Sequence, residues 1–277
     1  MVTTTTLSAD GPLPPSPSPD ETPFEIIEGD VASGLLFLCD HASNALPARY
    51  GSLGLPEAQL RRHIGYDIGA RGLTLLLARA FGAPAVLTTF SRLLIDPNRG
   101  EDDPTLVMRL SDGAVVPGNA RHDAVERAAR LEAFHRPYHR AIDERIDTAI
   151  EAGHPPAIVS IHSFTDVWRG VPRPWQAGIL WDSDPRFAVP LIAALARDPA
   201  LTIGDNEPYD GALKNDCMYR HGTARGLAHA LIEVRQDLIG DDAGIGDWAA
   251  RLEVALRQVL ASAPGLHDIR PHGLRCD

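Results

Sequence analysis

Cysteine is scarce in this chain of 277 residues, and its three cysteines form no Cys-x-x-Cys pair. An odd, unpatterned number of cysteines argues against a disulfide framework and favours a reducing compartment. The chain also lacks an uninterrupted run of about 18 apolar residues, the length that a membrane-spanning helix needs. Residues 1–20 contain neither the basic nor the apolar segment of a secretory signal. We therefore expect a cytoplasmic protein that has no membrane partner.

Basic residues are outnumbered, since the net charge is −11 and the isoelectric point is about 5.4. This balance argues against a nucleic-acid partner and fits a protein that handles small molecules. Residues 1–22 are rich in threonine, serine and proline, so we expect a disordered leader. Residues 23–277 are expected to form a single domain. Nothing in the sequence predicts an oligomeric state.

Several common catalytic motifs are missing. The chain contains no G-x-S-x-G, no G-x-x-x-x-G-K-[ST] and no H-E-x-x-H. The stretch Gly244-Ile245-Gly246 lacks the third glycine and the preceding strand of a dinucleotide site. These absences narrow the field to chemistry built from histidines and carboxylates.

Apolar, strand-like runs alternate with helix-like segments along the chain. This pattern is typical of a three-layer α/β fold, with a mostly parallel or mixed central sheet and helices on both faces. Strands are expected at residues 24–28, 35–39, 85–88, 93–95, 157–161, 178–181, 201–203 and 227–234, and helices at residues 57–62, 68–81, 121–152, 185–197 and 246–262. In such sheets a ligand site lies outside the carboxyl ends of the strands.

Four of the expected strands end in polar or charged residues. The ends are Asp40-His41 after residues 35–39, Asp96-Pro97-Asn98-Arg99 after residues 93–95, His162 after residues 157–161, and Glu233 to Asp237 at the end of residues 227–234. We expect these four ends to converge on one site.

The histidines in these ends predict a metal centre. A catalytic zinc site takes three N or O ligands and keeps one position open. His41 and His162 would supply imidazoles, although a single histidine at a strand end is more often a structural residue. Asp67, at the start of an expected helix, is favoured as the third ligand over the neutral amide of Asn44. Asp40 is a candidate partner that orients His41.

Glu233 is the natural general base for such a centre. Zinc lowers the pKa of the water that it binds, and a nearby carboxylate can take the proton and deliver it to a leaving amine. The alternative is a buried ion pair between Glu233 and Arg235 or Arg92. Strand alternation would aim Glu233 and Arg235 at the same pocket. Arg92, Arg99 and Arg235 would bind substrate carboxylates, unless they only form surface ion pairs.

At these residues the sequence resembles the N-formylglutamate amidohydrolase family, within a broader group of zinc-dependent amidohydrolases and carboxypeptidases. The matching segments are CDHASN at 39–44, HIGYDIGA at 63–70, SRLLIDPNR at 91–99, SIHSFT at 160–165, DNEPY at 205–209 and IEVRQDLI at 232–239. Their order along most of the chain carries the resemblance.

The resemblance implies a phosphorylase/hydrolase-like catalytic domain that holds one Zn²⁺ and cleaves an N-acyl amide, such as N-formylglutamate. It supports Asp67 over Asn44 as a ligand. The Asn98-Arg99 pair is similar to the Asn-Arg pair that binds substrate carboxylate in related aspartoacylases and carboxypeptidases.

The sequence therefore predicts a zinc-dependent amidohydrolase. Its metal ligands are His41, Asp67 and His162, its base is Glu233, and its substrate-binding residues are Arg92, Asn98, Arg99 and Arg235. Residues 204–221, with Tyr209 and His221, are a candidate lid. The alternatives are a peptidase or cell-wall amidase of the same fold, or a non-catalytic protein that binds small carboxylates.

Overall fold

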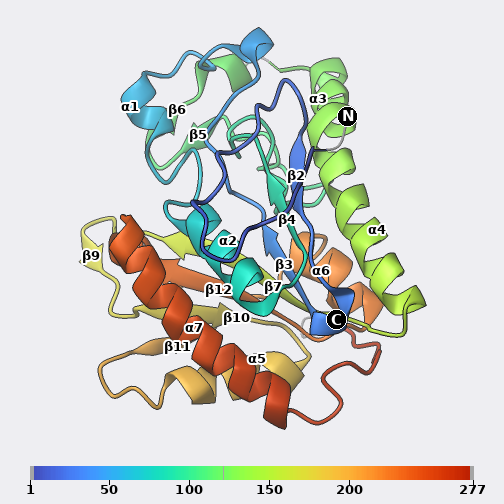
Figure 1. Ribbon diagram of the computed structural model, residues 1–277. Helices are drawn as coiled ribbons and strands as arrows, with labels where there is room; N and C mark the ends of the chain where they lie inside the picture. Colours follow the sequence, from blue (N-terminus) through green and yellow to red (C-terminus); the bar gives the residue numbers. More distant parts are fainter. Residues whose placement is uncertain (1–2, 121, 275–277) are drawn as a thin grey trace.

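A mixed sheet of eight strands runs through the structure, a computed structural model that describes residues 3–120 and 122–274. The strand order is β1-β2-β4-β3-β7-β12-β10-β11 (Figure 1). The bounds are β1 Thr3–Thr5, β2 Phe24–Ile27, β3 Leu35–Cys39, β4 Ala85–Thr88, β7 Ala157–Phe164, β10 Ala177–Leu180, β11 Ile203–Asp205 and β12 His229–Arg235. Strands β4, β3, β7 and β12 are parallel neighbours, so their carboxyl ends share one edge of the sheet.

Helices cover both faces of the sheet (Figure 1). One face carries α2 (Ala70–Phe81), α5 (Pro185–Leu195) and α7 (Asp242–Ser262), and the other carries α4 (Arg136–Glu151) and α6 (Cys217–His221). The remaining elements are short: α1 Glu57–Leu60, α3 Ala124–Arg130, and the strand pairs β5 Leu110–Ser111 with β6 Ala114–Val115 and β8 Val167–Trp168 with β9 Val171–Pro172. The expected α/β fold class is confirmed.

Side-chain alternation along the central strands decides which face receives the polar residues. In β7, Ile161 packs into the core under α2 and α7, so the next residue, His162, points to the α4 face. In β12, Val234 packs into the same core, so Glu233 also points to the α4 face. His162 and Glu233 are directly paired in the register of these two strands. The sheet therefore places both side chains on one surface.

The long helical stretch predicted at residues 121–152 is divided in the structure. Helix α3 and helix α4 are separated by one π-helical turn at Leu131–His135, and Pro137 lies in the first turn of α4. Proline is tolerated at that position because the first backbone N–H groups of a helix have no acceptor within the helix. The irregular turn thus lies just before Pro137.

The prediction of a strand at residues 93–95 is wrong. These residues form turns, although Leu93, Leu94 and Ile95 are fully buried. They pack into two small apolar clusters outside the main sheet. The apolar run correctly predicted that these residues are buried, but they belong to a buried loop and not to a strand.

Of the leader that we expect to be disordered, residues 1–22, the structure describes residues 3–22 and places parts of them against the sheet. Strand β1 pairs in parallel with β2, and Leu7 and Leu13 pack against the main core. Strand β2 therefore lies between β1 and β4. Polar composition shows that a segment cannot build its own core, but such a segment can still dock on an existing sheet. The extent of the catalytic domain stays a prediction.

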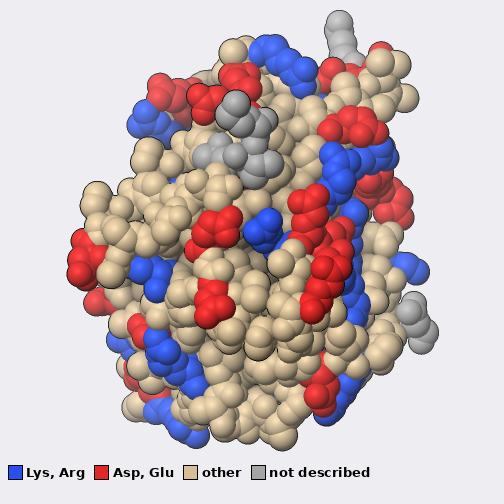
Figure 2. Space-filling view, turned by 45° about the vertical axis from the view of Figure 1, so that its right-hand side comes forward, with Lys and Arg blue, Asp and Glu red and all other residues tan. Residues whose placement is uncertain are grey.

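Charges are interspersed on the molecular surface. On the face shown in Figure 2, arginine and lysine side chains lie among aspartates and glutamates, without a continuous basic patch. The absence of a nucleic-acid partner stays a prediction. Among the described residues, no helix combines the length and apolar content that crossing a bilayer requires.

A buried ion pair ties the leader to the fold. The Glu25 carboxylate, 1% exposed, accepts hydrogen bonds from Thr5 Oγ1 (3.0 Å) and Arg71 Nη2 (2.6 Å). The Arg71 guanidinium also donates to the Pro14 carbonyl (2.8 Å). We predict that Arg71→Ala lowers the free energy of unfolding by about 3 kcal/mol, because it leaves a buried carboxylate unpaired. Urea titration measures this change.

The control for this prediction is Arg61→Ala, which removes a solvent-exposed ion pair with Glu57. Exposed pairs of this kind contribute little to stability. Equal effects of Arg71→Ala and Arg61→Ala would contradict the stabilising role given to the Glu25 contact.

Candidate metal centre

A cavity of about 250 Å³ opens at the shared carboxyl edge of the central strands. All but one of the predicted site residues line it: His41, Asp67, Arg92, Asn98, Arg99, His162 and Glu233. Arg235 is not among the lining residues. Tyr209, Asp210 and Gly211, from the expected lid segment, also line the cavity.

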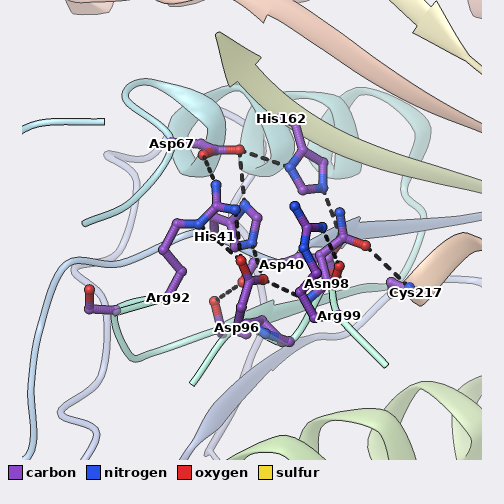
Figure 3. Close-up of polar contacts among 12 residues, drawn as sticks. Asp40, His41, Asp67, Arg92, Asp96, Asn98, Arg99, His162 and Cys217 are labelled. Atoms are coloured by element: carbon purple, nitrogen blue, oxygen red, sulfur yellow. Dashed lines mark hydrogen bonds and ion pairs between the residues drawn. The ribbon is translucent and has the colours of Figure 1, made fainter. Parts of the chain in front are cut away.

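One carboxylate oxygen joins the two predicted imidazole ligands (Figure 3). Asp67 Oδ2 lies 3.3 Å from His41 Nδ1 and 2.8 Å from His162 Nδ1. The ligand atoms of these three residues all lie within 4.8 Å of one another, and all three side chains are buried. The structure thus brings Asp67 together with both histidines. The Asn44 amide instead donates to the Leu60 carbonyl (3.2 Å).

The far nitrogen of each imidazole is held by a second carboxylate. His41 Nε2 donates to Asp96 Oδ1 (2.8 Å), and His162 Nε2 donates to Asp40 Oδ2 (2.9 Å). These bonds fix the Nε2–H tautomers, so a neutral imidazole directs its Nδ1 lone pair towards Asp67. Lone pairs that face a carboxylate need a cation between them, and carboxylate–histidine pairs commonly orient metal ligands. The donor set therefore fits a divalent cation.

The electrostatics of the cluster agree with this interpretation. Burial disfavours the ionised form of Asp67, yet the His41 and His162 imidazoles outweigh it and hold its pKa well below the usual range. Burial also disfavours a charged His162, but hydrogen bonds to Asp40 and Asp67 raise its pKa well above the usual value. The surroundings of Asp67 therefore favour an additional positive charge at this cluster.

Arg92 supports the cluster through Asp96. Its Nε and Nη2 atoms donate to Asp96 Oδ2 at 3.1 and 2.7 Å, and its Nη1 lies 3.6 Å from Asp67 Oδ1. Burial would raise the pKa of Asp96, but Arg92 and His41 hold it well below the usual value. Arg92 thus keeps ionised the carboxylate that orients His41.

Glu233 stands apart from these ion pairs. Its side chain is buried, and its Oε2 atom has no hydrogen-bond partner among the described residues. Burial raises its pKa to about 7. The sequence left open an ion pair of Glu233 with Arg92 or Arg235. In the structure both arginines pair with other carboxylates, since Arg92 bonds Asp96 and Arg235 bonds Asp237 (2.7 Å). Glu233 is thus a carboxylate available for proton transfer.

The Asn98-Arg99 pair follows Asp96 in a tight turn. Asp96 Oδ1 accepts from the Asn98 backbone N–H (2.9 Å), and Asn98 Oδ1 accepts from the Cys217 backbone N–H (3.2 Å). Arg99 Nη1 donates to the Asn98 carbonyl (2.7 Å). This turn carries both side chains to the cavity wall.

Asp67 lies just before α2 rather than in its first turn. The helix begins at Ala70, after Gly69 with φ of 80°. A Cβ at Gly69 would lie 2.1 Å from the Ile239 carbonyl oxygen, so only glycine fits there. The Asp67 backbone N–H donates to the His41 carbonyl (3.0 Å). This bond fixes the loop that presents the Asp67 carboxylate.

Asp40 and Asp96 have histidine partners that the sequence did not predict. Asp40, expected to orient His41, holds His162 instead and also accepts from Tyr138 Oη (2.9 Å) and Ser160 Oγ (2.8 Å). The partner of His41 is Asp96, for which the sequence predicted no role of its own. The one available signal for Asp96 was a carboxylate after an apolar run.

The predicted lid residues divide between the cavity and the interior. Tyr209 lines the cavity, and its hydroxyl oxygen accepts from Arg173 Nη1 (3.1 Å). His221 lies behind the cavity wall, fully buried in α6. The structure therefore brings Tyr209 to the site and keeps His221 away from it.

At the carboxyl edge of the α/β sheet, a buried His-Asp-His cluster that could hold a metal ion lies beside an unpaired carboxylate, an arrangement that hydrolytic enzymes use. The sequence matches the N-formylglutamate amidohydrolase family model over residues 33–240. The chain therefore belongs to the N-formylglutamate amidohydrolase family, and the resemblance noted in the sequence is confirmed.

Two solved structures are similar to this chain. A gene product from Agrobacterium tumefaciens shares 33% sequence identity and a TM-score of 0.82, covering 87% of this chain and 96% of its own. An N-formylglutamate amidohydrolase from Ralstonia eutropha shares 20% identity and a TM-score of 0.70, covering 88% and 99% respectively, and supports the fold alone. No curated protein sequence is significantly similar.

The raised pKa of Glu233 predicts a pH-dependent stability. Because burial raises it from 4.5 to about 7, the stability that the protonated carboxyl contributes is present below about pH 4.5 and is lost as pH rises through 7. The amide in Glu233→Gln cannot ionise. In chelator-treated protein, we expect the Tm difference between variant and wild type to shift in favour of the variant from pH 5 to pH 8.

Thermal unfolding at the two pH values, with the exposed-site variant Glu57→Gln as control, measures this shift. A Tm difference for Glu233→Gln that is the same at both pH values would contradict the buried, unpaired state of this carboxylate.

Proposed function

We propose that the protein hydrolyses the amide bond of a small N-acyl amino acid of the N-formylglutamate type, with one Zn²⁺ as cofactor. The observation that carries this proposal is the unpaired, buried Glu233 carboxylate beside the His-Asp-His cluster. Membership of the amidohydrolase family supports the reaction class. The unpatterned cysteines support a cytoplasmic setting.

His41 Nδ1, Asp67 Oδ2 and His162 Nδ1 would hold the metal ion. When bound, Zn²⁺ polarises a carbonyl oxygen and makes water a better nucleophile at neutral pH. Asp40 and Asp96 keep the two imidazoles in the tautomer that binds metal. This role needs no movement of the backbone, because both carboxylates are already within hydrogen-bond distance.

Glu233 would act as the general base and then as the general acid. Its Oε2 takes a proton from the attacking water while the water oxygen bonds to the acyl carbon. It then donates this proton to the amide nitrogen as the carbon–nitrogen bond breaks. The products are a carboxylate, formate in the case of a formyl group, and a free amine. A pKa near the working pH suits both steps.

The substrate carboxylates would be bound by the Asn98-Arg99 turn. Arg99 has a guanidinium fork on the cavity wall, and forks of this kind bind carboxylates with paired hydrogen bonds. Arg92, engaged with Asp96 and close to Asp67, would polarise the substrate carbonyl through its remaining Nη1 donor. Tyr209 and its neighbours would narrow the entrance over the substrate.

The first test of this function is Glu233→Gln. We expect hydrolysis of N-formylglutamate to fall by about 100-fold to 10 000-fold, as for the loss of a general base, while metal content stays unchanged. His162→Ala is the companion variant, and it should lose the ion of the His41, Asp67 and His162 site as well as the activity. Turnover of a panel of N-formyl and N-acyl amino acids, with metal analysis of the same samples, measures both effects.

Different results separate the alternatives. Full activity of Glu233→Gln would exclude Glu233 as the base. Binding of N-acyl amino acids without turnover by zinc-loaded wild-type protein would favour a non-catalytic carboxylate-binding protein. Turnover of peptides in preference to all small amides would favour a peptidase.

The second test concerns the substrate carboxylate. Arg99→Ala should raise KM for N-formylglutamate by about 10-fold or more, because a charge-assisted hydrogen bond is lost. The KM for N-formylglutamine, in which an amide replaces the side-chain carboxylate and the α-carboxylate remains, should change less. Arg235→Ala is the matched control, since Arg235 bonds Asp237 and does not line the cavity. Equal KM changes in the two arginine variants would contradict the assignment of Arg99.

A further inference from the structure

A second cluster of metal-ligating side chains lies behind the wall of the catalytic cavity. His139 from α4 and Cys217 and His221 from α6 have ligand atoms within 4.8 Å of one another. All three side chains are buried, with exposures of 1%, 0% and 0%. The cluster shares no residue with the His41, Asp67 and His162 centre, and the proposed function does not use it.

In His139 and His221, the ring nitrogen that points away from the other imidazole has an acceptor, and this contact determines which nitrogen carries the proton. His139 Nε2 lies 3.0 Å from the Pro97 carbonyl oxygen, which can only accept a hydrogen bond. His221 Nδ1 lies 3.1 Å from Asp143 Oδ1, and Asp143 is kept ionised because His221 and nearby arginines lower its pKa against the effect of burial. Both outer nitrogens therefore carry a proton.

The inner nitrogens of a neutral pair must then both be bare. His139 Nδ1 and His221 Nε2 face each other at 2.8 Å, with ring centroids 5.1 Å apart and ring planes inclined by 21°. Two lone pairs at this distance repel unless a proton or a metal cation lies between them. A proton would make one ring a buried imidazolium, and burial lowers the pKa of both His139 and His221.

We propose that His139 Nδ1, His221 Nε2 and Cys217 Sγ form a second metal site, which takes a thiophilic transition-metal cation of the Zn²⁺ type. Two imidazoles and one cysteine sulfur are a donor set that zinc and copper ions use, whereas Mg²⁺ and Ca²⁺ prefer oxygen. The carbonyl of Pro97 and the carboxylate of Asp143 orient the two imidazoles in the way that outer partners orient metal-binding histidines.

Binding at this site requires loss of the thiol proton. The metal–sulfur bond forms as the Cys217 S–H bond breaks, and the proton leaves to solvent. Burial, together with the nearby Asp40 carboxylate, raises the pKa of this thiol well above its usual value. Asp40 keeps its hydrogen bonds from Tyr138, Ser160 and His162 after this change, so the catalytic cluster stays assembled.

The position of the site gives it a structural role. It would fasten α6 to α4, next to the turn that carries Asn98 and Arg99. The Cys217 backbone N–H already bonds the Asn98 side chain (3.2 Å), and Pro97 lies between Asp96 and Asn98. A metal ion there would therefore hold the substrate-binding turn against the body of the domain.

Cobalt substitution tests this site selectively. Full-length protein would be produced in zinc-depleted medium that contains Co²⁺, and its absorption spectrum recorded. A cysteine thiolate bound to Co²⁺ gives a charge-transfer band in the near ultraviolet, which a His-Asp-His site cannot give. We expect this band in the wild type, with two metal equivalents per chain, and its loss together with one equivalent in Cys217→Ser.

The matched control is Cys39→Ser. Cys39 is equally buried but lies on the α2 face of the sheet. The thiolate band should persist in this variant and in His162→Ala, which removes only the catalytic ion. The band therefore reports the second site even if the proposed hydrolysis fails.

Three results would overturn the proposal. They are a cobalt-loaded wild type without a thiolate band, a band that survives in Cys217→Ser, and a metal content of His162→Ala that falls to zero although circular dichroism shows a folded protein.

Discussion

Two imidazoles share one carboxylate oxygen of Asp67, and the organisation of the cavity depends on this contact. The oxygen lies 3.3 Å from His41 Nδ1 and 2.8 Å from His162 Nδ1, inside a region that water barely reaches. Polar groups buried in this way are stable only when each has a partner. Asp40 and Asp96 supply those partners on the far side of each imidazole, and Arg92 supplies the charge that keeps Asp96 ionised. A bound divalent cation would complete the same network.

The fold delivers this network through strand direction and side-chain alternation. Because β3, β7 and β12 are parallel neighbours, their carboxyl ends bring residues far apart in the sequence to one edge of the sheet. Alternation then assigns His162 and Glu233 to the face that α4 covers. Gly69 allows the chain to turn into α2 immediately after Asp67. The proposed base and the proposed metal ligands thus belong to strands or to short loops fixed by backbone hydrogen bonds.

Much of this arrangement could be predicted from the sequence, because the central strands are continuous apolar runs that end in polar residues. The runs before His41, His162 and Glu233 are strands β3, β7 and β12, and the α/β class follows from them. The strand predicted at residues 93–95 is absent, since an apolar run indicates that residues are buried but not whether they form a strand or a loop. The pairing of His41 with Asp96 and of His162 with Asp40 depends on tertiary contacts across 55 and 122 positions. No local pattern encodes those distances, and composition likewise missed the docking of β1 on β2.

We propose that His41, Asp67 and His162 hold one metal ion next to Glu233. The most direct measurement is anomalous X-ray diffraction at the zinc absorption edge from crystals of zinc-loaded, active protein. We predict an anomalous peak for a zinc ion bonded to His41 Nδ1, Asp67 Oδ2 and His162 Nδ1, with Glu233 facing the open side of the ion. Active crystals in which no zinc peak contacts these three atoms, or in which Asn44 replaces Asp67 as a ligand, would contradict it.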